Sequence, residues 1–154
     1  MRGEPPSDPF RMRSSINIAL QTTVLVAATL MRFAQPGWLL ITFVISIVGP
    51  VLVAAHVVLA MTALNAPRLP RAVAVPFLVA AASLLAANLL LADFTDGPGR
   101  IPSPLETVTG FLSMELQGVG FVLLLVWGGS VVWIMVAMLV KRAVFRRVPV
   151  GSPA

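Results

Sequence analysis

His56 is the side chain best suited to acid-base chemistry in this chain, because an imidazole can gain or lose a proton near neutral pH. It is the only histidine among 154 residues, and it lies inside a long apolar stretch. A polar side chain at membrane depth needs a partner. Gln21 has a comparable depth in the preceding apolar stretch, so the sequence predicts a contact between Gln21 and His56. Together with two further polar side chains, they form a predicted intramembrane cluster of Gln21, Ser46, His56 and Asn88.

This cluster has two alternative interpretations. In the first, His56 relays protons or binds a substrate in a wet cavity. In the second, a neutral His56 forms a hydrogen bond between helices and has a structural role. The second is favoured, because a single titratable group makes a poor proton relay. One histidine also cannot supply both ligands of a bis-histidine haem, and we expect no cofactor.

Other catalytic and metal-binding chemistry is poorly represented. The chain contains no cysteine, which excludes disulfides, thiolate metal sites and cysteine nucleophiles. Glu106 and Glu115 are the acids that could pair in an outer active site, but no nucleophile, histidine cluster or metal-ligand motif accompanies them. We therefore expect no metal site. An enzyme that acts on a lipid-like substrate stays as a third alternative, for which Glu106, Glu115 and His56 would have to converge.

The composition places these residues in a membrane. Hydrophobic residues make up 58% of the chain and charged residues 11%, with a mean hydropathy of +0.94. Soluble domains have about 25% charged residues. Four apolar stretches, about 16–34, 38–64, 72–91 and 116–140, are long enough to cross the bilayer as helices. The predicted fold is therefore an all-α, four-helix transmembrane bundle spanning 16–140.

The basic residues predict the orientation of this bundle, because cytoplasmic segments retain Lys and Arg. The predicted outer side has only Arg32 and Arg100. We therefore expect both termini in the cytoplasm, as a disordered tail over 1–15 and a basic tail over 141–154. The excess of arginine over lysine, with abundant Ala, Val, Gly and Pro, indicates a GC-rich bacterium and hence its inner membrane. The remaining basic residues are all on the predicted inner side: Arg2, Arg11, Arg13, Arg68, Arg71, Lys141, Arg142, Arg146 and Arg147.

The outer connection over 92–115 is the one substantial loop, and it contains a helix start. Ser103 at the N-cap, Pro104 at the first helical position and Glu106 three residues after the cap form a predicted capping box. The loop should therefore hold a short helix at the membrane interface.

Arg32 lies at the outer end of the first stretch, against the positive-inside trend. We expect it to pair with Asp93 or Asp96 across the outer face of the bundle. A further irregularity is expected in the second stretch, where Gly49 and Pro50 predict a kink because proline removes a backbone hydrogen bond.

Two tryptophans at mid-membrane depth suggest a function. Trp127 and Trp133 lie away from the interface that tryptophan prefers, so we expect them to face outward and, with Phe111, to form a partner surface. The expected function is that of a non-catalytic accessory, assembly or scaffold subunit of a membrane complex. The alternative is a small homo-oligomeric transporter or channel with a polar path at the predicted cluster. We expect lipid and a membrane-protein partner or a second copy as contacts, and no nucleic acid, because the basic residues form no aromatic-interleaved patch.

Overall fold

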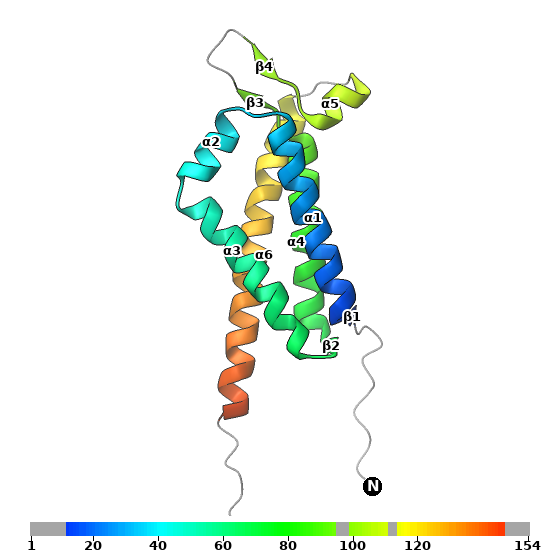
Figure 1. Ribbon diagram of the computed structural model, residues 1–154, viewed down its shortest axis with the longest axis vertical. Helices are drawn as coiled ribbons and strands as arrows, with labels where there is room; N and C mark the ends of the chain where they lie inside the picture. The colour runs from blue at the N-terminus through cyan, green and yellow to red at the C-terminus, as the bar shows by residue number, and fades with distance from the viewer. Residues whose placement is uncertain (1–11, 95–98, 111–113, 147–154) are drawn as a thin grey trace, which may run out of the picture.

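Four helices in this chain are long and apolar enough to cross a membrane. The computed structural model describes residues 12–94, 99–110 and 114–146. In Figure 1 the second span is broken into two pieces, whereas the other spans are continuous helices. The long helices are α1 (Ser14–Ala34), α4 (Arg71–Leu90) and α6 (Met114–Arg146), and the broken span consists of α2 (Trp38–Ile45) and α3 (Val48–Thr62).

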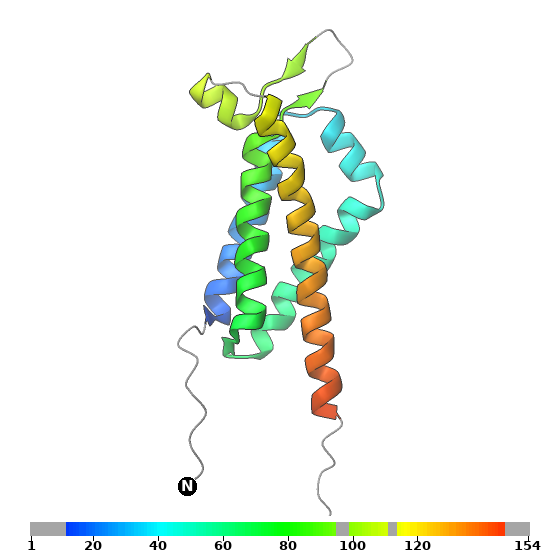
Figure 2. The same ribbon diagram turned by 180° about the vertical axis from the view of Figure 1, so that it is seen from behind.

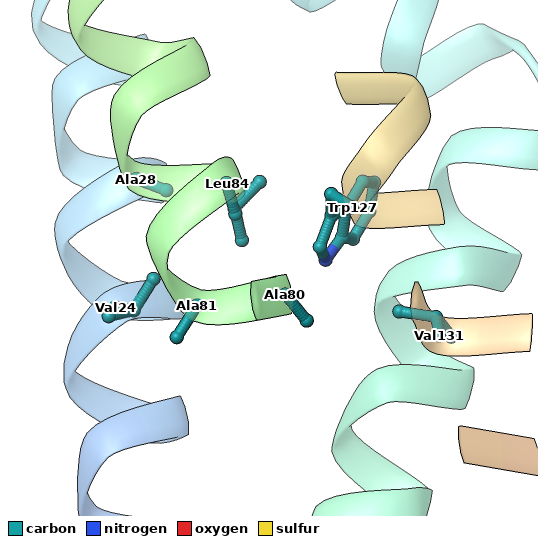
Figure 3. Close-up of a cluster of buried hydrophobic side chains, with 7 residues drawn as sticks. All are labelled: Val24, Ala28, Ala80, Ala81, Leu84, Trp127 and Val131. Atoms are coloured by element: carbon teal, nitrogen blue, oxygen red, sulfur yellow. The ribbon is translucent and has the colours of Figure 1, made fainter. Parts of the chain in front are cut away.

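Helix α4 lies between α1 and α6 and packs along both. Its sequence is rich in alanine, and Ala74, Ala80 and Ala87 are fully buried. Small side chains allow backbones to approach closely, which is how membrane helices associate when lipid offers no hydrophobic driving force. Figure 3 shows Ala80 and Leu84 on the side of α4 that faces Trp127 of α6. The bundle core is therefore centred on α4.

The second span is broken, which corrects the prediction of one kinked helix over 38–64. Helix α2 ends at Ile45 and α3 begins at Val48. Between them, the Ser46 hydroxyl donates a hydrogen bond to the carbonyl of Phe43 and accepts one from the backbone N–H of Gly49. Pro50 then falls in the first turn of α3, where its missing N–H leaves no hydrogen bond unmade. The helix stops before the Gly49–Pro50 pair instead of bending through it.

Short strands tie the ends of the bundle together, although the sequence predicted none. At one end, β1 (Met12–Arg13) pairs antiparallel with β2 (Arg68–Leu69), which follows the 3-10 turn Ala63–Asn65. At the other end, β3 (Asp93–Phe94) pairs antiparallel with β4 (Arg100–Ile101). We call these the β2 end and the α5 end of the bundle, after α5 (Pro104–Thr109). Both views in Figures 1 and 2 show α5 beyond the last turns of α1 and α4, close to the level at which α6 begins.

Two helix boundaries differ from the prediction at the tails. Helix α1 begins at Ser14, within the predicted tail over 1–15, and its first hydroxyl donates to the carbonyl of Ala66. Helix α6 continues to Arg146, six residues past the predicted limit of 140. Lys, Arg and Ala are good helix formers, so the basic segment prolongs the helix. The predicted tails otherwise fall on 1–11 and 147–154, outside the described residues.

Candidate functional site

The strongest candidate site is a buried polar cluster that joins α1, α3, α4 and α6. His56 Nε2 lies 2.8 Å from Gln21 Oε1, so the contact expected between these residues is present. Trp127 Nε1 lies 3.0 Å from His56 Nδ1. Gln21 Nε2 lies 3.2 Å from Asn17 Oδ1 and 3.1 Å from the carbonyl oxygen of Phe77. Asn17, Gln21 and His56 are fully buried, and Trp127 is 2% exposed.

The two ends of this cluster determine the direction of every hydrogen bond in it. The indole N–H of Trp127 can only donate, so His56 Nδ1 must be the acceptor. The proton of the imidazole then resides on Nε2, which donates to Gln21 Oε1. At the other end, the carbonyl of Phe77 can only accept, so Gln21 presents its NH₂ group to Phe77 and Asn17. Donation therefore runs from Trp127 through His56 and Gln21 to Asn17 and the Phe77 carbonyl.

One buried donor is left over at the end of this chain. Because Gln21 directs its NH₂ group at Asn17, Asn17 must present its oxygen, and its own Nδ2 faces away. Asn17 Nδ2 has no hydrogen-bond partner among the described atoms. A buried unpaired donor costs about 1–3 kcal/mol. The cluster therefore links four helices of the bundle but leaves one buried donor without a hydrogen bond.

Aromatic rings lie beside the imidazole, which is fully buried. The ring of His56 lies 6.3 Å from the rings of Phe77 and Trp127, measured between centroids. Phe43 adds a further contact, 6.4 Å from Trp127. Both nitrogens of His56 are occupied and its ring is covered. His56 could therefore act as a base or a ligand only after one of its two hydrogen bonds had broken.

The prediction that Trp127 faces outward is wrong. Trp127 points from α6 toward α4 and packs against Ala80 and Leu84 in the bundle core (Figure 3). The reason is its N–H group, which needs an acceptor at a depth where lipid offers none, and His56 supplies one. Trp133, the second tryptophan of the predicted partner surface, is 64% exposed. Phe111, its third member, lies outside the described residues.

Ser46 and Asn88 do not join His56 and Gln21. The hydroxyl of Ser46 is used at the break between α2 and α3. Asn88 belongs to a second polar group nearer the α5 end, where its Oδ1 accepts a hydrogen bond of 2.8 Å from Arg32 Nε. Its Nδ2 donates to the carbonyl of Leu84. The predicted cluster thus divides into a Gln21–His56 pair, an Arg32–Asn88 pair and a separate serine.

The expected outer ion pair also takes another form. Asp93 is 1% exposed, and its Oδ1 accepts a 2.7 Å hydrogen bond from the backbone N–H of Leu39, in the first turn of α2. A carboxylate is favourable there because the N-terminus of a helix carries partial positive charge. Arg32 and Asp93 are close enough to attract electrostatically, but the hydrogen bond of Arg32 is to Asn88. The other expected acid, Asp96, lies outside the described residues.

The helix start predicted in the outer loop is present. The backbone N–H of Glu106 donates to Ser103 Oγ, and the Glu106 carboxylate accepts from the backbone N–H of Ser103. Glu106 also forms an ion pair of 2.5 Å with Arg100 on β4. Gly110 ends the helix in the left-handed conformation with a φ of 66°. Glu106 is therefore engaged in holding α5 on the β3–β4 ladder.

A cavity of about 560 Å³ lies beside the Arg32–Asn88 pair. Its lining comes from α1, from both pieces of the broken span, from α4 and from α6. The walls are mostly apolar, and Arg32, Asn88 and Ser46 are among the polar side chains that reach it. Sequence reasoning missed this cavity, because its lining includes residues from both pieces of the broken span and the sequence did not predict the break. Figure 1 shows the break between α2 and α3 set away from the other helices.

In the part of the chain that the structure describes, no three His, Cys, Asp or Glu side chains gather at metal-binding distances. The arrangement can hold helices together at His56 and can bind an anion beside an apolar cavity at Arg32. Comparison with known proteins adds no precedent: no protein-family model, curated protein or solved structure matches the chain.

Proposed function

We propose that this chain is a non-catalytic accessory, assembly or scaffold subunit of a larger membrane complex. The observation that carries the proposal is the contrast between the buried interior of the bundle and the exposed surface along α4 and α6. The His56 cluster is closed, and its members hydrogen-bond to one another. On this exposed surface, an open groove lies between α4 and α6. Trp133 lines the groove, and its side chain is 64% exposed.

The lining of this groove suits a partner helix. We define the α4–α6 groove by the residues that line it, which include small side chains and one tryptophan: Arg71, Ala72, Val75, Pro76, Val79, Val126, Gly129, Ser130 and Trp133. Small residues allow a second helix to approach closely. The Ser130 hydroxyl donates its proton to the carbonyl of Val126, and its oxygen can still accept a hydrogen bond from a partner. Tryptophan is enriched among the residues that dominate binding energy in protein interfaces. The groove has the composition of a helix-docking surface.

We also propose that both termini face the cytoplasm of a bacterial inner membrane. The support is the distribution of arginine and lysine: Arg13, Arg68 and Arg71 cluster at the β2 end, and the basic segment after Val140 extends α6 toward the same side (Figure 1). At the α5 end, Arg100 is neutralised by Glu106. This asymmetry has the sign of the positive-inside rule.

Purification of tagged protein from its native host in mild detergent, followed by mass spectrometry, tests the proposal. We expect a membrane protein to be recovered in stoichiometric amount with the wild type, and its recovery to fall at least tenfold with Trp133→Ala. Leu30→Ala is the matched control, because Leu30 is 63% exposed on α1. It should leave the recovery unchanged. Equal losses with both variants, or no co-purifying protein, would contradict the proposal.

A small homo-oligomeric transporter or channel is the second candidate. The observation that favours it is the broken second span, since transporters build their sites from interrupted helices. The same purification separates the two candidates. Recovery of the chain as a homo-oligomer without other proteins would favour transport.

A further inference from the structure

We propose that the cavity at the α5 end binds one phospholipid from the surrounding bilayer, with the lipid phosphate on Arg32 and an acyl chain along the broken span. This inference does not depend on the proposed partner, because the cavity and the α4–α6 groove share no lining residue.

The size and lining of the cavity fit an acyl chain. Its volume of about 560 Å³ falls within the range of about 300–1,000 Å³ in which ligand pockets lie. Leu25, Phe43, Val53 and Leu124 bring apolar walls from four helices. An apolar space inside a bilayer is in contact with a reservoir of acyl chains.

The charge at the cavity fits a phosphate. Arg32 lines the cavity, and its only hydrogen bond to the described part of the chain uses Nε. A guanidinium carries five N–H donors, so the four on Nη1 and Nη2 remain for a ligand. They form a planar fork that matches phosphate oxygens. Asn88 fixes this fork, because its amide is itself held by the Leu84 carbonyl.

The depth of Arg32 selects a lipid over a soluble anion. Arg32 lies two residues before the end of α1, which is about 3 Å along the helix axis. This is where a span passes from hydrocarbon into headgroups. Asp93, an acid that interacts electrostatically with Arg32, already accepts the N–H of Leu39. A phosphate at the interface could reach Arg32 while its acyl chain enters the cavity below.

Native mass spectrometry of delipidated protein in detergent tests the proposal. The probes are dioleoyl phosphatidylglycerol and dioleoylglycerol, which carry the same chains with and without a phosphate. We expect one phosphatidylglycerol per chain at limiting lipid and at least tenfold less dioleoylglycerol. Arg32→Gln should lower phosphatidylglycerol retention about tenfold. Arg68→Gln, which removes an exposed arginine at the β2 end, should leave it unchanged.

A second variant tests the position of the acyl chain without altering charge. Ala54 lines the cavity, and Ala54→Phe would fill part of it. We expect this variant also to lower retention about tenfold. Equal retention of both lipids, or wild-type retention by either Arg32→Gln or Ala54→Phe, would overturn the proposal.

Discussion

Replacing Trp127 with alanine should lower the free energy of unfolding by about 3 kcal/mol, the lower end of the range for large-to-small core substitutions. The lower end applies because the side chain would otherwise face lipid and not water, so the hydrophobic effect contributes little to its burial. What is lost is packing against Ala80 and Leu84 and the hydrogen bond to His56. His56 Nδ1 would also be left buried without its donor. Reversible unfolding in detergent micelles, followed by circular dichroism, measures the change.

Two variants separate the contributions. Trp127→Phe keeps most of the packing and removes the N–H, so it should cost about 1 kcal/mol. Trp133→Ala removes the same side chain six residues along α6 from an exposed position, and it should change stability by less than about 0.5 kcal/mol. Similar losses from Trp127→Ala and Trp133→Ala would show that Trp127 is not a core residue.

Adding a methyl group at Gly49 should cost about 1–3 kcal/mol. A Cβ placed there would overlap the backbone carbonyl oxygen of Phe43 and lie 2.8 and 2.9 Å from two atoms of the Phe43 ring. A ring can rotate away, whereas the carbonyl can move only if the break between α2 and α3 changes. Gly49→Ala therefore tests whether the second span is broken at this position.

The matched control is Gly129→Ala on α6, where an added Cβ meets no atom within 4 Å. Alanine is a better helix former than glycine, so this variant should be neutral or stabilising by up to about 1 kcal/mol. The same unfolding experiment compares the two variants. If Gly49→Ala were as stable as Gly129→Ala, the close contact between Gly49 and Phe43 would be contradicted.

Much of the architecture could be predicted, because spanning a bilayer imposes a length and a hydropathy that are readable in one dimension. The predicted span over 72–91 differs from α4 by one residue at each end. The capping box at Ser103 and Glu106 was equally readable, because its two hydrogen bonds are local in sequence. The break in the second span at Ser46 could not be predicted. It depends on how a serine hydroxyl serves two backbone groups, and Gly49–Pro50 alone indicated only a distortion nearby.

Part of the candidate site could be predicted from the sequence. Depth matching was sufficient to bring Gln21 to His56, because both lie on polar faces of neighbouring spans. Sequence reasoning gives the wrong position for Trp127, because the usual preference of tryptophan for interfaces predicts that it faces outward. A usable signal was present: an indole N–H at mid-membrane needs an acceptor, and His56 has a second ring nitrogen to offer.

The bundle contains polar side chains at two depths, around His56 and around Arg32, and the two groups are suited to different roles. At the level of His56, the donors and acceptors that join the helices are paired with one another, apart from the amide nitrogen of Asn17. At the level of Arg32, one hydrogen bond to Asn88 holds a side chain that lines a cavity. We therefore assign a structural role to the first level and ligand binding to the second.

The His56 cluster is a closed hydrogen-bond chain that runs from Trp127 to the Phe77 carbonyl. Nitrogen-15 NMR of histidine-labelled protein in nanodiscs at neutral pH tests it directly, because His56 is the only histidine. We expect a single neutral tautomer with the proton on Nε2 and none on Nδ1. A proton on Nδ1, whether in the other neutral tautomer or in the imidazolium, would contradict the chain, because Trp127 could then no longer donate to that nitrogen.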